Sequence, residues 1–220
     1  DKNITTVEDP VEYRLQGINQ VQAKAQIGLT FATGLRAFLR QDPDVIMVGE
    51  VRDLETAEIC VRAALTGHLV LSTLHTNDAP SAVSRLTDLG IEPFLLSPSL
   101  ILVIAQRLVR RLCTECKTEY QITEDVKKRL PPESGDKFFK AVGCDFCRKS
   151  GYSGRVGIYE TLYITDKVQQ VIAKGATADQ IQEAARESGF QTLMEYGITK
   201  AATGETSLEE VFSATLARGG

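Results

Sequence analysis

A carboxylate and two histidines flank two predicted strands in the first third of the chain. Val45–Val48 is an unbroken apolar run, typical of a strand that is buried on both faces, and after one glycine it reaches Glu50. A second apolar run, Leu69–Leu74, lies between His68 and His75, the only histidines in the chain. Ligands of open α/β sheets bind at the edge where the strands have their carboxyl ends. We therefore regard these three polar side chains as candidates for a binding or catalytic site.

A second acidic pair follows another predicted strand. β-Branched residues dominate Asn3–Val7, which favours a strand, and Glu8 and Asp9 come directly after it, before Pro10 ends the ladder. An apolar strand that delivers an acid to a sheet edge has the form of a Walker B element, which acts around Mg²⁺ and an attacking water. A single motif of this kind is more often an ordinary surface acid. The second strand with its histidines is what favours a catalytic interpretation.

Four of the five cysteines form two C-x-x-C pairs. Cys113 with Cys116 and Cys144 with Cys147 are separated by 27 residues, and such paired knuckles place four thiolates around one Zn²⁺ at about 2.3 Å each. The intervening segment is polar, so we expect little core there and metal ligation to compensate for it. Four cysteines leave no open coordination position, so we predict a structural zinc; redox dithiols and unligated cysteines are the alternatives. Cys60 lies in an apolar helical pattern and is predicted to be an inert buried thiol.

Helices are expected to position these strands. Apolar residues at helical spacing predict a helix over Phe31–Arg40, in which Arg36 and Arg40 lie four residues apart on one face. Two such arginines are usually just a solvated face. A second helix is predicted over Leu54–Thr66, closed by a glycine.

Three further elements complete an alternating order of strands and helices. Val11–Leu15 and Ile18–Gln22 flank a Gln-Gly pair and predict a hairpin. Asp78 is a good N-cap for the helix that follows it, and a long apolar helix with a basic C-terminal end is expected from about Phe94. The alternation predicts an α/β sheet layered with helices.

The last third of the chain is predicted to contain a short strand, Arg155–Leu162, followed by a helical subdomain without a catalytic constellation. Apolar stripes and glycines at helix ends support this interpretation. Three capping boxes mark the predicted helix starts: Thr177 with Gln180, Thr192 with Glu195, and Ser207 with Glu210.

Composition sets the bounds on function. At 220 residues and 43% hydrophobic, the chain can bury a core in one large domain or two small ones. Its net charge of −4 gives no basic footprint, which disfavours bulk nucleic-acid binding. The longest apolar segment, Ile91–Ala105, is broken by two prolines and is too short to span a bilayer. No signal peptide opens the chain, so we expect a soluble intracellular protein in which the paired cysteines hold metal.

Taken together, the motifs resemble those of the motor ATPases of type II secretion and type IV pilus assembly, within the secretion-ATPase superfamily. The family's Asp box is matched by ITTVEDPVEY, its Walker B region by GLRAFLRQDPDVIMVGEVRDLETAE, and its His box by TGHLVLSTLHTNDA. The family's tetracysteine zinc module is matched by AQRLVRRLC, followed later by CDFC and GYSGRVGIYE. This module points to the assembly branch, since the retraction motors of pili lack it.

The resemblance implies a fold and a domain order. We expect an α/β chain with a partial RecA-like P-loop ATPase core over residues 1–111, an inserted tetracysteine zinc module over 112–150 and a C-terminal, mainly helical subdomain over 151–220. The phosphate-binding loop G-x-x-x-x-G-K-[ST] does not occur in the sequence. In the family this loop precedes the Asp box, so we infer that the chain begins just downstream of it and does not hydrolyse ATP alone.

The resemblance also implies roles for the acids. Glu50 would be the Walker B acid that positions Mg²⁺ or polarises the attacking water. Glu8 would be the Asp-box acid, acting as general base or holding the water shell of the metal, with Asp9 beside it in the sequence. A carboxylate of ordinary pKa is a weak base, so water activation would depend on positioning and charge more than on proton abstraction.

Histidines and arginines would act on the phosphates in this scheme. His75, and less surely His68, would approach the γ-phosphate and report its presence, since phosphate favours the charged imidazole. Without the flanking motifs, two histidines around a strand are ordinary polar ends. Arg36 and Arg40 could stabilise phosphoryl transfer in cis or from a neighbouring subunit.

The family further implies what the whole machine does. Such motors hydrolyse ATP, with Mg²⁺ bound through water and phosphates, and Zn²⁺ is structural. They form homo-hexamers whose domain motions pass to an inner-membrane platform protein, which adds pilin-like subunits to a filament. We accordingly expect a cytoplasmic protein, peripheral at the inner membrane through its partners, without a transmembrane segment or direct nucleic-acid contact. Protein secretion, pilus extension and DNA uptake are not distinguished by the sequence.

Two other functional classes compete with this one. A zinc-ribbon module that binds protein or nucleic acid without enzymatic activity would fit the local run of basic residues, although no aromatic platform interleaves them. These residues are Arg107, Arg110, Arg111, Lys117, Lys127, Lys128 and Arg129. A thiol–disulfide protein is disfavoured because the C-x-x-C pairs lie in no thioredoxin-like context.

Overall fold

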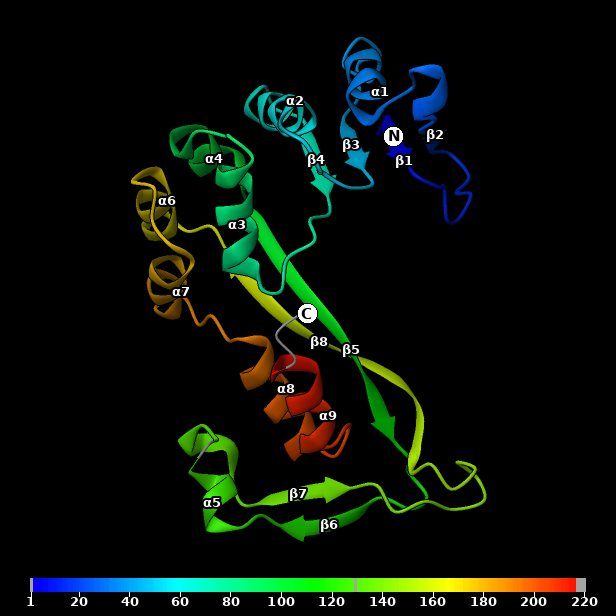
Figure 1. Cartoon of the computed structure of the whole chain (residues 1–220), viewed down its shortest axis with the longest axis vertical. Helices are drawn as coiled ribbons and strands as arrows, with labels where there is room; N and C mark the ends of the chain where they lie inside the picture. The colour runs from blue at the N-terminus through cyan, green and yellow to red at the C-terminus, as the bar shows by residue number, and fades with distance from the viewer. Residues whose placement is uncertain (1, 129, 217–220) are drawn as a thin grey trace. The chain divides into compact units, whose positions relative to one another are not determined.

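A parallel sheet of four short strands carries the predicted acids and histidines. The computed structural model describes residues 2–128 and 130–216, so Arg129 lies outside the described residues. The strands β1 (Ile4–Glu8), β2 (Asn19–Gln22), β3 (Val45–Val48) and β4 (Leu69–Ser72) stand in the order β2-β1-β3-β4 (Figure 1). Every neighbouring pair is parallel, with Val7 opposite Val48 and Val48 opposite Ser72. All four strands therefore end at the same edge of the sheet.

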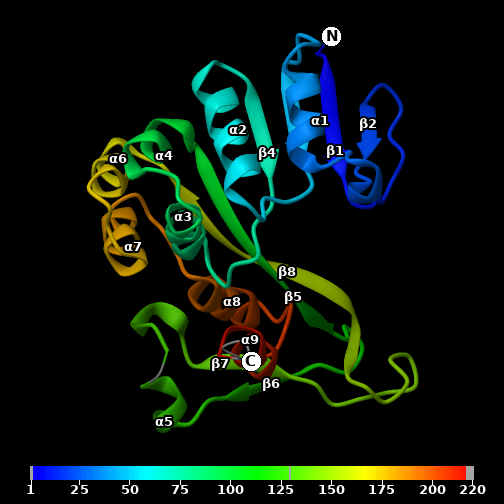
Figure 2. The same ribbon diagram turned by 45° about the horizontal axis from the view of Figure 1, so that its top comes forward.

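Two amphipathic helices, α1 (Phe31–Phe38) and α2 (Leu54–Leu65), pack beside this sheet (Figure 2). The hydroxyl of Thr30 accepts the backbone N–H of Thr33 and so caps α1. The Asp53 carboxylate caps α2 in the same way. The predicted α/β order of this region is thus confirmed, and Cys60 is buried inside α2 as expected.

The chain consists of two compact units. Unit 1 contains Asp1–Thr76, Pro80–Leu102 and Tyr163–Ala185. Unit 2 contains Asn77–Ala79, Val103–Leu162 and Arg186–Gly220. The division into the three domains 1–111, 112–150 and 151–220 stays a prediction of the sequence.

Unit 1 adds helices to the sheet. They are η1 (Ala25–Ile27), most of α3 (Ala79–Asp88), α4 (Pro93–Ser99), α6 (Asp166–Ala173) and α7 (Ala178–Arg186). The Ser97 hydroxyl donates to the backbone carbonyl of Gln169 at 2.9 Å, which ties α4 to α6. Among the described residues, no helix combines the length and apolar character that crossing a membrane requires.

Unit 2 is organised around two long strands, β5 (Leu102–Leu112) and β8 (Tyr152–Tyr163), which pair with each other and run in opposite directions (Figure 1). A second pair, β6 (Thr118–Gln121) and β7 (Lys137–Lys140), is antiparallel. The helical elements of this unit are α5 (Glu124–Lys127), η2 (Pro132–Ser134), α8 (Leu193–Ala202) and α9 (Leu208–Leu216).

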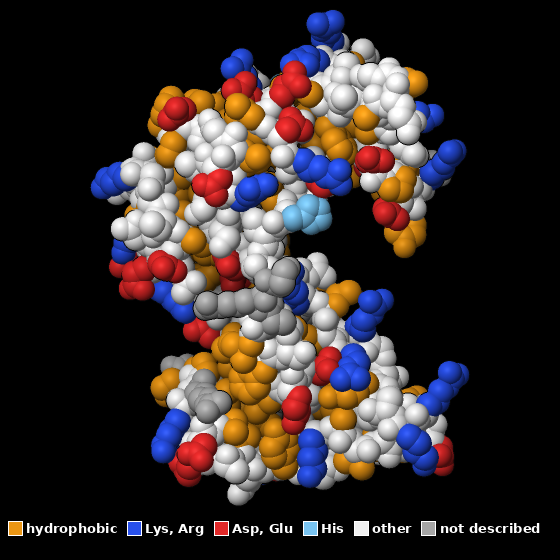
Figure 3. All heavy atoms as spheres, in the orientation of Figure 1, with side chains coloured by type: hydrophobic (Ala, Val, Ile, Leu, Met, Phe, Trp, Pro, Cys, Tyr) orange, Lys and Arg blue, Asp and Glu red, His pale blue; other side chains and the backbone are white. Residues whose placement is uncertain are grey.

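The segment between the cysteine pairs has little core of its own, as the sequence predicts, and its few buried residues join a core formed mainly by two helices. Phe138 of β7 is fully buried and packs with residues of α8 and α9. The buried members of this cluster are Leu130, Phe138, Ile198, Ala201, Leu208 and Val211. Figure 3 shows hydrophobic side chains gathered on the face of the region that holds α5, α8 and α9 in Figure 1. A few apolar residues in a polar segment are enough here because two amphipathic helices supply the rest of the cluster.

The long helix predicted from Phe94 is wrong. Only α4 is helical there, and from Leu102 the chain forms β5. Exposure alternates along β5 from Leu102 to Val109, the period of two that a strand requires. β-Branched Val103, Ile104 and Val109 favour this conformation. The alternation of exposed and buried positions was not apparent from the sequence, because apolar residues occupy both kinds of position.

The hairpin predicted around Gln16 and Gly17 is also wrong. Val11–Leu15 forms no strand, and β2 pairs with β1 in parallel. Residues 9–18 instead form a loop that returns the chain to the edge of the sheet at which β1 begins, so that β2 can run parallel to β1. The side chain of Gln20 shapes this loop, because it donates to the carbonyl of Tyr13 at 2.9 Å and accepts the N–H of Leu15 at 2.7 Å.

Two of the three predicted capping boxes are complete. Thr177 with Gln180 and Thr192 with Glu195 exchange both hydrogen bonds. At the third, Ser207 accepts the N–H of Glu210, but the Glu210 carboxylate binds the backbone N–H and guanidinium of Arg110 on β5. A charged donor from another element therefore replaces the reciprocal half of the box.

The contact between α8 and α9 depends on a glycine. A Cβ at Gly197 would lie 2.7 Å from Cγ1 of Val211. We expect Gly197→Ala to lower the free energy of unfolding by about 1–3 kcal/mol, since overpacking outweighs the gain in helix propensity. Thermal unfolding would measure this, with exposed Thr199→Ala on the same helix as control. A melting temperature equal to that of the control would contradict the packing.

Candidate functional site

Three parallel strands bring Glu8, Glu50 and His75 to one edge of the sheet. Glu8 is the last residue of β1, Glu50 follows β3 by two residues, and His75 follows β4 by three. The His75 Nε2 atom lies 3.2 Å from a carboxylate oxygen of Glu50. The Glu50 side chain is 12% exposed and that of His75 is 85% exposed, so the imidazole remains accessible to a ligand.

Backbone contacts around Gly49 hold the strand ends together. The Gly49 N–H donates to the carbonyl of Val7 at 2.8 Å, and a Cβ at this position would lie 3.3 Å from Cα of Glu8. From the other side, the Thr73 hydroxyl donates to the Gly49 carbonyl at 2.6 Å. The glycine therefore lets β3 approach β1 closely at the point where both acids emerge.

Arg52 belongs to the site although sequence reasoning did not select it. Its guanidinium forms an ion pair with Glu50, and this bond, ahead of the opposing effect of burial, holds the pKa of the Glu50 carboxyl below its usual value. Asp9 also lies close enough for its charge to raise the pKa of Arg52. Glu50 is therefore a carboxylate at neutral pH, the form that a divalent cation or a polarised water requires. The sequence could have indicated this ion pair, because Arg52 follows Glu50 by only two residues.

Two neutral side chains orient Glu8. The carboxylate is buried, and one of its oxygens accepts the Thr6 hydroxyl at 2.5 Å and the Gln20 amide at 3.0 Å. Thr6 was within reach of sequence reasoning, because residues two apart in a strand share a face. Gln20 was not, because the predicted hairpin would have placed β2 differently.

His68 lies at the opposite end of β4 from His75. Its Nδ1 atom is 3.0 Å from the carbonyl of Ala63 and 3.2 Å from the hydroxyl of Thr66, at the C-terminal end of α2. The structure does not bring it to Glu50. Its predicted contact with a phosphate stays a prediction.

The two arginines also lie apart from the acids. Arg36 is exposed on α1 and pairs with Glu55 of α2. Arg40 is exposed beyond the last residue of α1, in the segment that leads to the start of β3, and so lies toward the other edge of the sheet. Their predicted part in phosphoryl transfer therefore stays a prediction.

This edge of the sheet presents the carboxylate oxygens of Glu8 and Glu50 together with the charged guanidinium of Arg52. Metal-assisted phosphoryl transfer uses oxygen ligands and charged hydrogen-bond donors of these kinds. Hard cations such as Mg²⁺ prefer carboxylate and water oxygens and keep several waters. Glu8 and Glu50, fixed by their neighbours on adjacent strands, fit such a water-mediated site. Two carboxylates of this kind position water more effectively than they deprotonate it.

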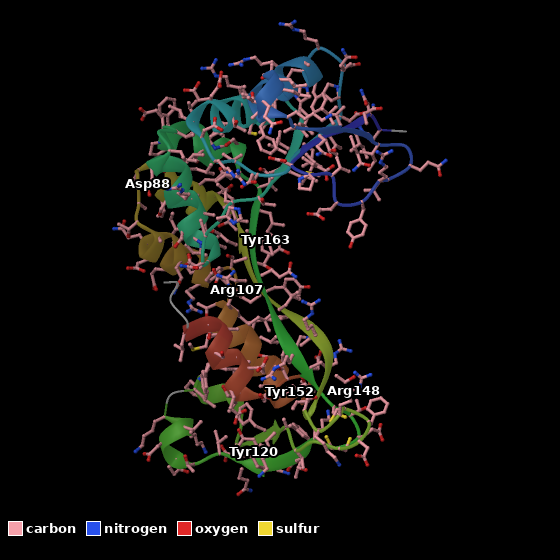
Figure 4. All side chains as sticks on the ribbon, turned by 45° about the vertical axis from the view of Figure 1, so that its right-hand side comes forward. Asp88, Arg107, Tyr120, Arg148, Tyr152 and Tyr163 are labelled. Carbon is pink, nitrogen blue, oxygen red and sulfur yellow. The ribbon has the colours of Figure 1, made fainter. Side chains whose placement is uncertain are left out.

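The four predicted metal-binding cysteines come together in unit 2. The Sγ atoms of Cys113, Cys116, Cys144 and Cys147 all lie within 4.8 Å of one another. Cys113 and Cys144 are 3.9 Å apart, Cys116 and Cys147 are 3.8 Å apart, and the Cys144–Cys147 distance is 3.7 Å. Four sulfurs bound tetrahedrally at about 2.3 Å from Zn²⁺ lie about 3.8 Å apart, so this spacing fits the metal. Figure 4 shows sulfur atoms gathered beside Arg148.

Backbone N–H groups point at the sulfurs. Cys147 accepts the N–H of Cys144 and of Gly151, each at 3.2 Å, and the first of these bonds contributes most to a pKa lowered to about 6. Cys116 accepts the N–H of Gly143 at 3.3 Å, but burial dominates there and raises the pKa to about 11. Such donors stabilise thiolate ligands and orient them.

Comparison with known proteins identifies the family of this chain. The family model described as "Type II/IV secretion system protein" matches residues 1–213. The chain belongs to this family. It is 52% identical over 220 residues to the type IV pilus assembly ATPase PilB of Thermus thermophilus, covering 98% of the chain and 25% of that protein. It is 54% identical over 213 residues to the type II secretion system protein HxcR of Pseudomonas aeruginosa, covering 97% of the chain and 42% of that protein. The chain thus spans less than half the length of these secretion-family relatives.

A solved structure of the family shares the fold. The crystal structure of the pilus retraction motor PilT with bound ADP matches with a TM-score of 0.70 at 30% identity. The match covers 97% of this chain and 52% of that one. The α/β core predicted from the sequence is therefore confirmed as that of a secretion ATPase.

Proposed function

We propose that this chain is the part of a motor ATPase of type II secretion or type IV pilus assembly that contains the Asp box, Walker B strand, His box and tetracysteine module. The longer protein would couple ATP hydrolysis to the assembly of a pilin-like filament. The observation that carries the proposal is the convergence of Glu8, Glu50 and His75 at one sheet edge in a chain of this family. A zinc-binding module without enzymatic activity would not require that edge.

The acids act on water and metal in this proposal. Glu50, kept anionic by Arg52, would hold the water shell of Mg²⁺ or polarise the attacking water. Glu8, oriented by Thr6 and Gln20, would act with it from the neighbouring strand, and Asp9 follows Glu8 in the sequence. Mg²⁺, when bound with ATP, neutralises the charge that develops on the phosphates.

His75 would contact the γ-phosphate and so respond to its presence. Its exposed imidazole lies 3.2 Å from a carboxylate oxygen of Glu50 and is accessible to a γ-phosphate. Arg36 and Arg40 would reach a phosphate only from a neighbouring subunit, given their places in this chain. His68 is the weakest member of the predicted set, since it packs at the other end of β4.

The proposal also covers the bound zinc, the oligomeric state and the location of the motor. Zn²⁺ bound by the four cysteines would be structural, because four thiolates close its coordination shell. The motor would be a homo-hexamer in the cytoplasm, held at the inner membrane by a platform protein. We propose neither a transmembrane segment nor direct nucleic-acid contact for it.

The test compares two lengths of the protein. A protein extended upstream to the length of its relatives should hydrolyse ATP in the presence of Mg²⁺. The 220-residue chain should not, because it contains no G-x-x-x-x-G-K-[ST] loop to bind the β- and γ-phosphates. Phosphate release measured side by side decides the matter. An inactive long protein, or turnover by the short chain that depends on Glu50, would refute the proposal.

A further inference from the structure

The chain enters and leaves the second cysteine pair through two segments that lie very close to each other. A Cβ at Gly143 would lie 2.6 Å from the carbonyl oxygen of Lys149, and a Cβ at Gly151 would lie 2.5 Å from Cβ of Ala141. Nonbonded carbon atoms normally lie about 3.5–4.0 Å apart. Only glycine therefore allows this approach at both positions. The two segments, which we call the base of the pair, are residues 141–143 and 149–151, all in unit 2.

The backbone turns sharply directly after the second cysteine pair. Arg148 and Lys149 have φ of 52° and 64°, and Gly151 has φ of 75°, so these residues lie in the left-handed region. The Ser150 hydroxyl donates to the carbonyl of Cys147 at 2.6 Å and holds the turn from within. Left-handed residues other than glycine cost free energy. Hydrogen bonds and packing of the base therefore have to maintain this turn.

Backbone groups of the base bind both cysteine pairs. Gly151 donates its N–H to Sγ of Cys147 at 3.2 Å, and its carbonyl accepts the N–H of Cys113 at 2.9 Å. Gly143 donates its N–H to Sγ of Cys116 at 3.3 Å. The base thus connects the second pair, which it carries, to both members of the first pair.

The positions of the sulfurs therefore depend on the width of the base. N–H donors of this kind orient metal ligands and offset part of the negative charge that four thiolates bring to one divalent ion. A methyl group at either glycine would push the two segments apart by about 1 Å to restore normal contact. The donors to Cys116 and Cys147 would move with the segments, and so would the carbonyl that holds Cys113.

We propose that Gly143 and Gly151 are positioning residues of the tetracysteine metal site. Because neither has a side chain, the base is narrow enough for their N–H groups to reach the sulfurs. The two residues thereby set the sulfur spacing of 3.7–3.9 Å that fits a tetrahedral Zn²⁺. This inference concerns metal binding and does not depend on the proposed ATPase activity.

The competing explanation is that both glycines serve only their backbone conformation. Each has a positive φ, at which any other residue is strained whatever space surrounds it. Gly154 offers the matched control, because its φ of 75° equals that of Gly151 and no atom of the described residues lies within 4 Å of its Cβ position. Gly154→Ala therefore introduces the same strain without the clash. A loss of zinc affinity in Gly143→Ala and Gly151→Ala that Gly154→Ala does not share belongs to the width of the base.

The zinc affinity of the 220-residue chain tests the proposal. Each variant is loaded with zinc and titrated with a chelator of known affinity, and circular dichroism checks that it is folded. We expect Gly143→Ala and Gly151→Ala to bind zinc about 10- to 100-fold more weakly than the wild-type chain, the range typical of groups that orient metal ligands. Gly154→Ala should bind zinc as tightly as the wild type. Unchanged affinity in either base variant, or an equal loss in Gly154→Ala, would overturn the proposal.

Cobalt shows whether the geometry of the sulfurs changes. The visible spectrum of bound Co²⁺ reports its coordination geometry, so the wild type and Gly154→Ala should give the same spectrum, and the two base variants a shifted and weaker one. A lower affinity with an unaltered spectrum would mean that the glycines act only on the stability of the fold, which also overturns the positioning role. Should both base variants fail to fold, Ser150→Ala provides the test, since it releases the turn without adding an atom. Weaker zinc binding is then expected, and unchanged zinc binding overturns the proposal.

Discussion

Glu50→Gln in the full-length ATPase is expected to lower kcat for ATP hydrolysis by about 100-fold or more, the range typical of a positioned acid–base group. The amide keeps the shape of the side chain but loses the negative charge that holds Mg²⁺ waters or polarises the attacking water. It also breaks the ion pair with Arg52. Nucleotide binding should persist, because the phosphates are held mainly elsewhere. Steady-state phosphate release and the affinity for an ATP analogue would separate the two effects.

A glutamate outside the site provides the control for this prediction. Glu58 lies on α2 and pairs with Arg62 on the helix surface. Glu58→Gln makes the same chemical change without touching the sheet edge, so kcat should stay at the wild-type value. Equal losses in the two variants, or an unaffected kcat in Glu50→Gln, would rule out the assigned role.

The protonation of Glu50 sets the direction of any pH effect from this residue. Because Arg52 lowers its pKa from the usual value of 4.5, Glu50 is ionised above that value and gains a proton only at lower pH. Its contribution should thus be fully present at neutral pH and lost as the pH falls below the usual carboxyl range. A loss of activity between pH 6 and 7 would therefore have to come from another group.

The strands that carry the site were predictable because they are short, apolar and followed by acids. Val45–Val48 has the bounds in the structure that its hydrophobic run predicts, and the parallel order then brings Glu8, Glu50 and His75 to one edge. The cysteine pairs were predictable because metal ligation constrains their spacing more than any neighbour does.

The contacts that orient the site were much harder to foresee. Gln20 reaches Glu8 only because β2 returns parallel to β1, and the N–H of Gly143 reaches Cys116 across 27 residues of sequence. Neither contact leaves a periodic signal. The sequence also contained no sign of the partner strand of the segment after Leu102, which was therefore predicted to be helical. A long apolar run is compatible with a helix and with a half-buried strand. The local sequence pattern therefore located the candidate residues at the sheet edge, whereas tertiary pairing determined which side chains orient them.

Loss of one thiolate from the tetracysteine site is the other change with a large expected effect. Cys144→Ser in the 220-residue chain should abolish tight zinc binding, because Cys144 contacts both Cys113 and Cys147 in the cluster. Zinc contributes about 10–16 kcal/mol of apparent binding free energy in small zinc domains. Even a quarter of the upper figure, about 4 kcal/mol, would lower the melting temperature by about 8–16 °C in a protein of this size.

The rest of unit 2 should nevertheless stay folded in this variant. Phe138 and its neighbours on α8 and α9 form a core that does not include the cysteines. Circular dichroism should therefore show retained secondary structure at low temperature, unlike a zinc finger that unfolds without metal. The melting curve should move to lower temperature, and a chelator should move that of the wild-type protein in the same direction.

Cys60 makes the prediction specific to the cluster. Burial raises the pKa of its thiol to about 12, and it lies in α2 of unit 1, so Cys60→Ala should keep the full zinc content. Zinc measured by atomic emission, together with thiol titration, distinguishes the remaining possibilities. A wild-type protein without zinc but with four reactive thiols would mean unligated cysteines. One without zinc or reactive thiols would mean disulfides, which would require the sulfurs to approach from 3.7–3.9 Å to about 2.05 Å.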